Sequence, residues 1–209
     1  MGAGHQTTQA PDSCVGDVIR LARHAGARNW IPATSGNFSV RIDAAACAIT
    51  ATGGDKAALT ASGVIRAELS GPKHPRASAE APLHYMLYRL LPEAAAVAHV
   101  HAQSSVLASL QLCNDGQVGL RDLEMLKAFR GFQTHASTLN VPVFDNDQDM
   151  DELAMRVEKS ISGSSLQWGF LLAGHGLYAW GTSTEETLRH LDAFDYLFSL
   201  SLKMKGIPA

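Results

Sequence analysis

The sequence predicts an α/β fold in which helices cover one mixed or mainly antiparallel sheet. Segments with helical spacing of apolar residues alternate irregularly with short segments typical of strands, and hairpin patterns stand near both ends. No internal repeat or low-complexity linker divides the chain, which indicates one sheet with one set of covering helices. The 209 residues fit one domain. We therefore expect a single domain over residues 1–209, of which about residues 1–11 form a flexible N-terminal tail.

The first half of the chain predicts two helices and three strands. Apolar residues recur at helical spacing after Asp12 and Ser13, either of which can cap a helix that runs to about Gly26. Ser78 begins a second helix, which ends at Pro92 because proline cannot continue it. The strands that we expect are a hairpin at 38–42 and 48–52 and a buried strand at 95–102.

The second half of the chain predicts four more helices and three more strands. The helices are expected at 103–112, 120–129, 149–161 and from 184 to about 205. Pro142 lacks a backbone donor, so residues 141–144 are expected to form an edge strand. Two further strands, 170–173 and 177–180, flank the turn Gly174-His175-Gly176. Ser183 and Thr184 precede Glu186 as a cap of the last helix.

Composition excludes several classes of function. A formal net charge of -3 gives no global support for binding nucleic acid. The three cysteines, at positions 14, 47 and 113, are too far apart for a CxxC metal pair and form no disulfide framework. The N-terminus lacks the pattern of a signal peptide, and no apolar run reaches the roughly 18 residues of a membrane span. We expect a cytoplasmic protein that acts on neither membranes nor nucleic acids.

The histidines predict a metal site. His99 and His101 stand two residues apart, and a strand directs such side chains to one face, where both can reach one ion. Catalytic zinc commonly takes three protein ligands and leaves one position open. His175, between two glycines, is the first candidate for the third ligand, and His135 is the second. The alternative is that His99 and His101 are hydrogen-bonded core residues.

Three segments rich in small residues are candidates for binding phosphate. Such segments offer hydroxyls, amides and freely oriented backbone N–H groups, which can cradle an anion. Each segment alone is also consistent with an ordinary turn or helix cap. The residues that we expect to contact substrate or phosphate are Ser35, Gly36 and Asn37, then Ser62 and Gly63, then Ser78 and Ala79.

Two carboxylates are candidates for catalysis. Glu80 stands in the first turn of the helix expected from Ser78, beside the possible anion site. Glu124 stands among apolar neighbours, and burial there would raise its pKa and suit it to proton transfer. A capping residue and a solvated helix face are the alternatives for Glu80 and Glu124. His84, one helical turn after Glu80, is expected to be a buried structural residue.

Taken in order, these motifs resemble the class II aldolase/adducin family over nearly the whole chain. They are Ser35-Gly36-Asn37, Thr60-Ala61-Ser62-Gly63, Ser78-Ala79-Glu80, His99-Val100-His101 and Gly174-His175-Gly176. The resemblance implies a three-layer α/β/α sandwich with a mixed, mainly antiparallel central sheet. It also implies one zinc ion per subunit, on His99, His101 and His175, and a homotetramer whose active sites lie near subunit interfaces.

Within this family, four segments are most similar to members that remove water from a small phosphorylated ketose. They are 78–84, 123–127, 146–149 and 176–181. The resemblance makes Glu124 the acid/base, whereas Glu80 falls where sugar-phosphate aldolases keep their catalytic carboxylate. Ala79 replaces the second of the paired serines with which those aldolases bind phosphate. The alternatives are a sugar-phosphate aldolase or epimerase, and a non-catalytic adducin-like binding module.

Overall fold

One eight-stranded sheet runs through the molecule, and helices cover both of its faces. The computed structural model describes residues 9–161 and 168–208, so positions 1–8 of the expected tail lie outside the described residues. The helices are α1 (Asp12–Ala27), α2 (Ala81–Leu90), α3 (Gln103–Gln111), α4 (Met150–Ile161) and α5 (Thr184–Met204), with short 3-10 turns η1 (Pro32–Thr34), η2 (Ala61–Gly63) and η3 (Glu124–Ala128). The strands are β1 (Asn37–Arg41), β2 (Ala46–Thr50), β3 (Val64–Glu68), β4 (Ala96–Val100), β5 (Gln117–Arg121), β6 (Thr138–Phe144), β7 (Gly169–Leu172) and β8 (Gly176–Gly181).

The sheet is mixed and mainly antiparallel, which confirms the predicted fold class. The strand order is β3-β2-β1-β4-β8-β7-β6-β5, and among the described strands only β6 and β7 pair in parallel. In the centre of the sheet, His99 of β4 stands opposite Asn37 of β1 on one side and Tyr178 of β8 on the other. This register places three polar side chains beside one another where β4 ends.

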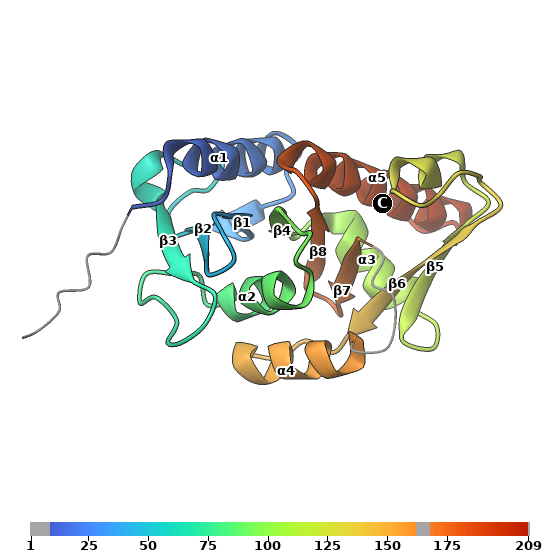
Figure 1. Cartoon of the computed structure of the whole chain (residues 1–209). Helices are drawn as coiled ribbons and strands as arrows, with labels where there is room; N and C mark the ends of the chain where they lie inside the picture. Colours follow the sequence, from blue (N-terminus) through green and yellow to red (C-terminus); the bar gives the residue numbers. More distant parts are fainter. Residues whose placement is uncertain (1–8, 162–167, 209) are drawn as a thin grey trace, which may run out of the picture.

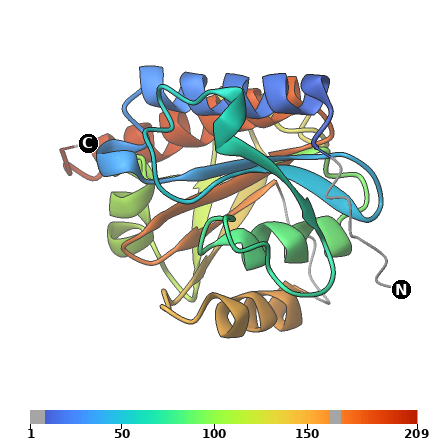
Figure 2. The ribbon, with the colours of Figure 1, turned by 90° about the vertical axis from the view of Figure 1, so that its left-hand side faces the viewer.

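Helices α1 and α5 lie along one face of the sheet, and α2 and α4 lie along the other (Figures 1 and 2). Alternate side chains of each strand point into the two layers. Phe38 packs with α1 and α5, whereas Val97 and Tyr178 pack with α2 and α4. Asn37, Ser39, His99 and His101 have the same alternation as Val97, so their side chains face the α2 layer.

Two strands that the sequence pattern did not predict, β3 and β5, complete the sheet. The predicted helix at 120–129 is wrong, because residues 117–121 pair with β6 and Asp122 then takes a left-handed φ of 60°. Of the expected helix only the turn η3 forms. Strand β6 is not an edge strand, since it lies between β5 and β7. Pro142 is tolerated because β6 changes there from antiparallel pairing with β5 to parallel pairing with β7.

The helix ends differ from the predictions in detail. Helix α1 begins at Asp12 with no side-chain cap, so neither Asp12 nor Ser13 acts as predicted. Helix α2 begins at Ala81, three residues later than predicted, because Ser78 to Glu80 form a turn before it. The predicted cap of α5 is confirmed, since Ser183 accepts a hydrogen bond from the backbone N–H of Glu186. Among the described residues, no helix has the length and apolar character to span a membrane.

Candidate metal centre

The end of β4 and the turn between β7 and β8 bring three histidines together. His99 is the fourth residue of β4, His101 follows the end of the strand, and His175 lies in the turn before β8. Gly176 allows this approach, because a Cβ atom there would lie 2.2 Å from the carbonyl oxygen of Val100. The structure thus brings His175 to the predicted pair of histidines.

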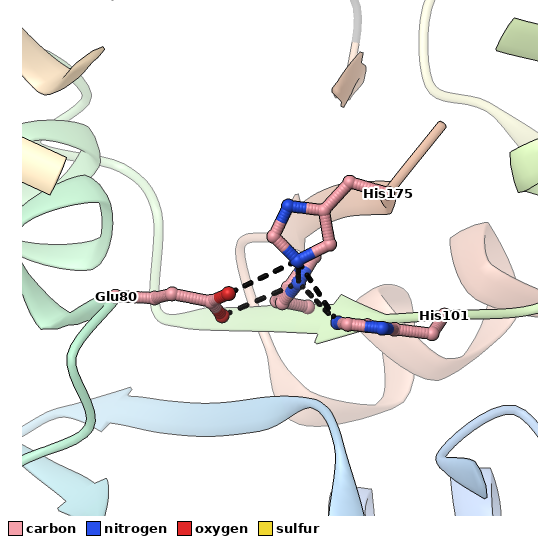
Figure 3. A group of neighbouring side chains, drawn as sticks. Glu80, His101 and His175 are labelled. Atoms are coloured by element: carbon pink, nitrogen blue, oxygen red, sulfur yellow. Dashed lines mark hydrogen bonds and ion pairs between the residues drawn. The ribbon is translucent and has the colours of Figure 1, made fainter. Parts of the chain in front are cut away.

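The four groups of the centre converge on one point. The Nε2 atom of His99 lies 2.9 Å from that of His101 and 3.3 Å from that of His175, and the last two are 3.1 Å apart. The carboxylate of Glu80 lies 3.0 Å from His175 Nε2 and 3.3 Å from His99 Nε2. Figure 3 shows Glu80, His101 and His175 pointing toward one another. All four potential ligand atoms lie within 4.8 Å of one another.

These imidazoles have the protonation that metal ligands need. The Nδ1 atom of His99 lies 3.0 Å from the carbonyl oxygen of Leu177, and Nδ1 of His175 lies 3.0 Å from Asn146 Oδ1. Both partners are acceptors, so Nδ1 carries the proton and Nε2 directs a lone pair into the centre. Burial lowers the pKa of His99 to about 3 and that of His101 to about 4, so both rings are neutral near pH 7.

The donor set fits a divalent cation. Two nitrogens bound at about 2.0–2.1 Å in a tetrahedral site lie roughly 3.3 Å apart, close to the separations of 2.9, 3.1 and 3.3 Å found here. Lone pairs that face one another at such distances repel unless a cation lies between them. Glu80, one of the two predicted catalytic carboxylates, lies in this centre. Its carboxylate either completes the ligand set or lies beside the open position.

Glu80 is held as an ionised acceptor. Burial favours a higher pKa, but the adjacent imidazoles of His99 and His175 and a hydrogen bond from Asn37 outweigh it and bring the pKa of Glu80 well below its usual range. Tyr178 stacks its ring on His99 with 4.1 Å between centroids and donates a hydrogen bond to Glu80 at 3.5 Å. Tyr178, like Asn146, was not among the predicted site residues, because only the sheet register brings it here.

A buried chain of hydrogen bonds leads from Glu80 into the α2 layer. The ionised carboxylate can only accept, so Asn37 turns its NH2 group toward Glu80 and its Oδ1 toward His84 Nε2, 2.5 Å away. Burial lowers the pKa of His84 to about 4, so the ring is neutral, donates from Nε2 and accepts at Nδ1 from the Ser39 hydroxyl at 2.7 Å. Ser39 in turn accepts from the Tyr88 hydroxyl at 2.9 Å. The expectation of a buried structural His84 is confirmed. Every hydrogen bond in this series is donated in the same direction, toward Glu80.

Within one polypeptide chain, Glu124 and His135 lie away from the metal centre. The side chain of Glu124 is 70% exposed, so the expectation that apolar neighbours bury it is wrong. A hydrogen bond from Lys127, at 2.6 Å, lowers the pKa of Glu124, where burial was expected to raise it. The turn η3 buries Leu126 instead and packs against α5, on the face of the sheet opposite α2. His135 is also exposed and lies 3.9 Å from Glu124.

The three predicted phosphate segments are linked at the edge of the sheet where β4 ends. Arg76 accepts a hydrogen bond from the backbone N–H of Thr52 and donates one to the carbonyl of Ser62 at 2.9 Å. Asn37 and Glu80 join the segments 35–37 and 78–80 by their hydrogen bond. The structure therefore gathers these segments, although it places Ser62 and Gly63 two strands away from Asn37, beside β3.

Lys56 is a further residue of this region that the sequence analysis missed. It is 7% exposed and donates a hydrogen bond to the carbonyl oxygen of Thr34 at 2.6 Å. A lysine in a polar loop ordinarily points into solvent, so no pattern in the sequence distinguishes this one. Only its position relative to the loop 33–36 shows that it is buried.

Known proteins are similar to this chain in sequence. The family model described as Class II Aldolase and Adducin N-terminal domain matches residues 16–202. A methylthioribulose-1-phosphate dehydratase of Parvibaculum lavamentivorans is 50% identical over 185 residues, which cover 88% of this chain and 91% of that protein. The protein of the same name from Citrobacter koseri is 40% identical over 193 residues, covering 91% and 94%.

Solved structures agree in fold. The L-fuculose-1-phosphate aldolase of Thermus thermophilus matches with a TM-score of 0.75 and 26% identity, covering 93% of this chain and 97% of that one. The sugar-phosphate aldolase of Thermotoga maritima matches in fold with a TM-score of 0.69 at 16% identity, covering 93% and 96%. From the match of the family model across the sheet and its histidines, together with these relatives, it follows that the chain belongs to the class II aldolase and adducin family.

Proposed function

We propose that this chain is a zinc-dependent dehydratase that converts 5-methylthioribulose 1-phosphate to 2,3-diketo-5-methylthiopentyl 1-phosphate and water, a step of methionine salvage. The observation that carries the proposal is the convergence of three imidazoles and a carboxylate on one point. The relatives named methylthioribulose-1-phosphate dehydratase, of which one is 50% identical, support the choice of substrate. Neutral imidazole nitrogens favour zinc among the common catalytic ions.

The ion supplies Lewis acidity, which polarises a carbonyl group and makes the adjacent C–H bond more acidic. His99, His101 and His175 would hold it. Hydrogen bonds from Nδ1 of His99 to Leu177 and from Nδ1 of His175 to Asn146 fix these two rings. Glu80 and Tyr178 border the same point and limit the space beside it.

The reaction needs a group that takes a proton from C3 and gives one to the hydroxyl that leaves C4 as water. We assign this role to Glu124, whose exposed carboxylate can accept a proton, although the lowered pKa makes it a weaker base than the burial expected from the sequence would have made it. The enol that results tautomerises to the diketone, so atoms and charges balance. Glu80, ionised and held by hydrogen bonds from Asn37 and Tyr178, is the second carboxylate of the site and the alternative base.

Glu124 can act only on the centre of another subunit if the chain keeps this fold. It lies on the α5 side of the sheet, whereas Glu80 lies at the start of α2 on the other side. The exposed side chains beside it, Met125 at 38% and Tyr196 at 52%, are consistent with a surface that a neighbouring copy covers. This supports the proposed homotetramer with active sites near subunit interfaces.

The phosphate group is proposed to lie against the segments 35–37, 62–63 and 78–79. The hydrogen bonds that Arg76 makes to Thr52 and Ser62 support this, since they gather the segments at the sheet edge. Ala79 offers no hydroxyl, so its contribution is limited to the backbone N–H.

Assaying the purified, zinc-loaded protein with 5-methylthioribulose 1-phosphate tests the proposal. We expect a diketone with its phosphate retained, detected by ultraviolet absorbance and mass spectrometry. An aldolase is the second candidate, because the fold matches that of a solved L-fuculose-1-phosphate aldolase at 26% identity. Release of a two-carbon or three-carbon fragment would support that candidate and refute the dehydratase. A folded protein that binds no metal and turns over neither substrate would indicate an adducin-like binding module.

A further inference from the structure

A small cavity lies between α2, α4 and the loop that follows β3. The two helices pack against each other on one face of the sheet (Figures 1 and 2). The volume of the cavity is about 290 Å³, just below the roughly 300–1,000 Å³ of pockets for drug-sized ligands, so an occupant is a small molecule. The lining residues are distinct from Glu80 and the three histidines; they are Leu69, Ser70, Gly71 and Lys73 of the loop, Pro82, Tyr85 and Arg89 of α2, and Asp151, Ala154, Met155 and Glu158 of α4.

The hydroxyl of Tyr85, in the α2 wall of this cavity, lacks a hydrogen-bond partner. Tyr85 is 5% exposed, and its hydroxyl oxygen is buried without a partner among the described residues. Burial raises the pKa of the phenol well above its usual range, so the group is neutral and can donate a hydrogen bond. Buried polar groups are nearly always hydrogen-bonded, so this hydroxyl indicates a bound molecule that supplies an acceptor.

Charges of opposite sign line different walls of the cavity. Lys73 of the loop and Arg89 of α2 are cationic, whereas Asp151 and Glu158 of α4 are anionic. Arg89 donates one hydrogen bond, from Nη1 to the carbonyl oxygen of Leu69 at 2.9 Å, which leaves further N–H donors on its guanidinium group. Within the described part of the chain, neither Lys73 nor Asp151 forms an ion pair. A molecule that carries both a negative and a positive group would therefore find a partner for each.

We propose that this cavity binds a free α-amino acid with an apolar side chain. The carboxylate of the amino acid accepts hydrogen bonds from Tyr85 and Arg89, its ammonium faces Asp151, and its side chain contacts Pro82 and Met155. A simple carboxylic acid would leave the carboxylates of α4 without a counter-ion, and a simple amine would leave the phenol without an acceptor. The assignment is independent of the proposed function, because the cavity is separate from the metal centre.

Calorimetric titration of the zinc-loaded protein with L-leucine tests this site without any turnover. Two ligands of matched shape are the controls: 4-methylpentanoic acid, which lacks the ammonium group, and 3-methylbutylamine, which lacks the carboxylate. We expect L-leucine to bind at least about tenfold more tightly than either, because each control loses one charge-assisted hydrogen bond. Equally tight binding of 4-methylpentanoic acid would show that the ammonium group is not recognised and would refute the assignment to an amino acid.

Substitutions in two walls of the cavity test the same site from the side of the protein. Tyr85→Phe removes only the hydroxyl, and we expect it to weaken L-leucine binding about tenfold, the loss typical of a hydrogen bond to a charged group. Asp151→Asn, at an exposed position of α4, should weaken binding about two- to fivefold. Glu152→Gln, at the exposed neighbour outside the cavity lining, is the matched control and should bind as the wild type does.

Thermal melting of each variant shows that the fold is intact, and Asp151→Asn serves if Tyr85→Phe does not fold. A wild type that binds no L-leucine would overturn the assignment. Variants Tyr85→Phe and Asp151→Asn that both bind L-leucine as tightly as the wild type would overturn it as well, since the amino acid would then lie elsewhere.

Discussion

Replacing His84 tests whether the buried hydrogen-bond chain positions Glu80. The ring of His84 is fully buried and joins Asn37 to Ser39. In His84→Leu the side-chain oxygen of Asn37 loses its hydrogen-bond donor, which lowers the stability of the fold by about 1–3 kcal/mol. The Ser39 hydroxyl loses its acceptor, which lowers the stability by about 1 kcal/mol more. We therefore expect the free energy of unfolding to fall by about 2–4 kcal/mol. Urea unfolding of the metal-free protein measures this loss.

The same variant is expected to bind zinc more weakly, because Asn37 can then rotate and release Glu80. Removal of a group that orients a ligand costs roughly 10–100-fold in metal affinity. Competition with a chelator of known affinity measures the change. His190→Leu is the matched control, since His190 is equally buried and bonds to the carbonyl of Trp180 at 2.7 Å, away from the centre. If both variants lose stability but bind zinc equally well, the buried hydrogen bonds of His84 stabilise only the core and do not position Glu80.

Three further outcomes are expected. His175→Ala should lose zinc in metal analysis while His135→Ala keeps it; the reverse pattern would move the ligand role to His135. Glu124→Gln should keep zinc but lose about 10²–10⁴-fold in kcat, and near-normal turnover would remove Glu124 from the mechanism. Burial lowers the pKa values of His84 and His190 to about 4, so they contribute stability above about pH 6.5 that is lost as the pH falls toward 4. Urea midpoints that do not fall between pH 7.5 and 5 would contradict this.

The sequence determined the local features of the protein, because these depend on near neighbours in the chain. The hairpin of β1 and β2, the long helix α5 with its Ser183 cap and the pairing of His99 with His101 on one face all follow from periodicity or short motifs. The ordered set of motifs determined the family as well. Periodicity gave a wrong prediction at 120–129, because the few apolar residues of a short segment fit the spacing of a helix as well as that of a strand.

The tertiary structure alone decided which distant residues meet. No local pattern relates His175 or Glu80 to the end of β4; the strand order and the side-chain alternation do so. The burial of Lys56 and the exposure of Glu124 also depend on which layer covers each segment. The packing of several elements at once determines the solvent exposure and the electrostatic surroundings of each side chain. Exposure and surroundings in turn determine its protonation state and the groups that it can contact. The chemistry of the site therefore depends on contacts that the order of residues along the chain does not display.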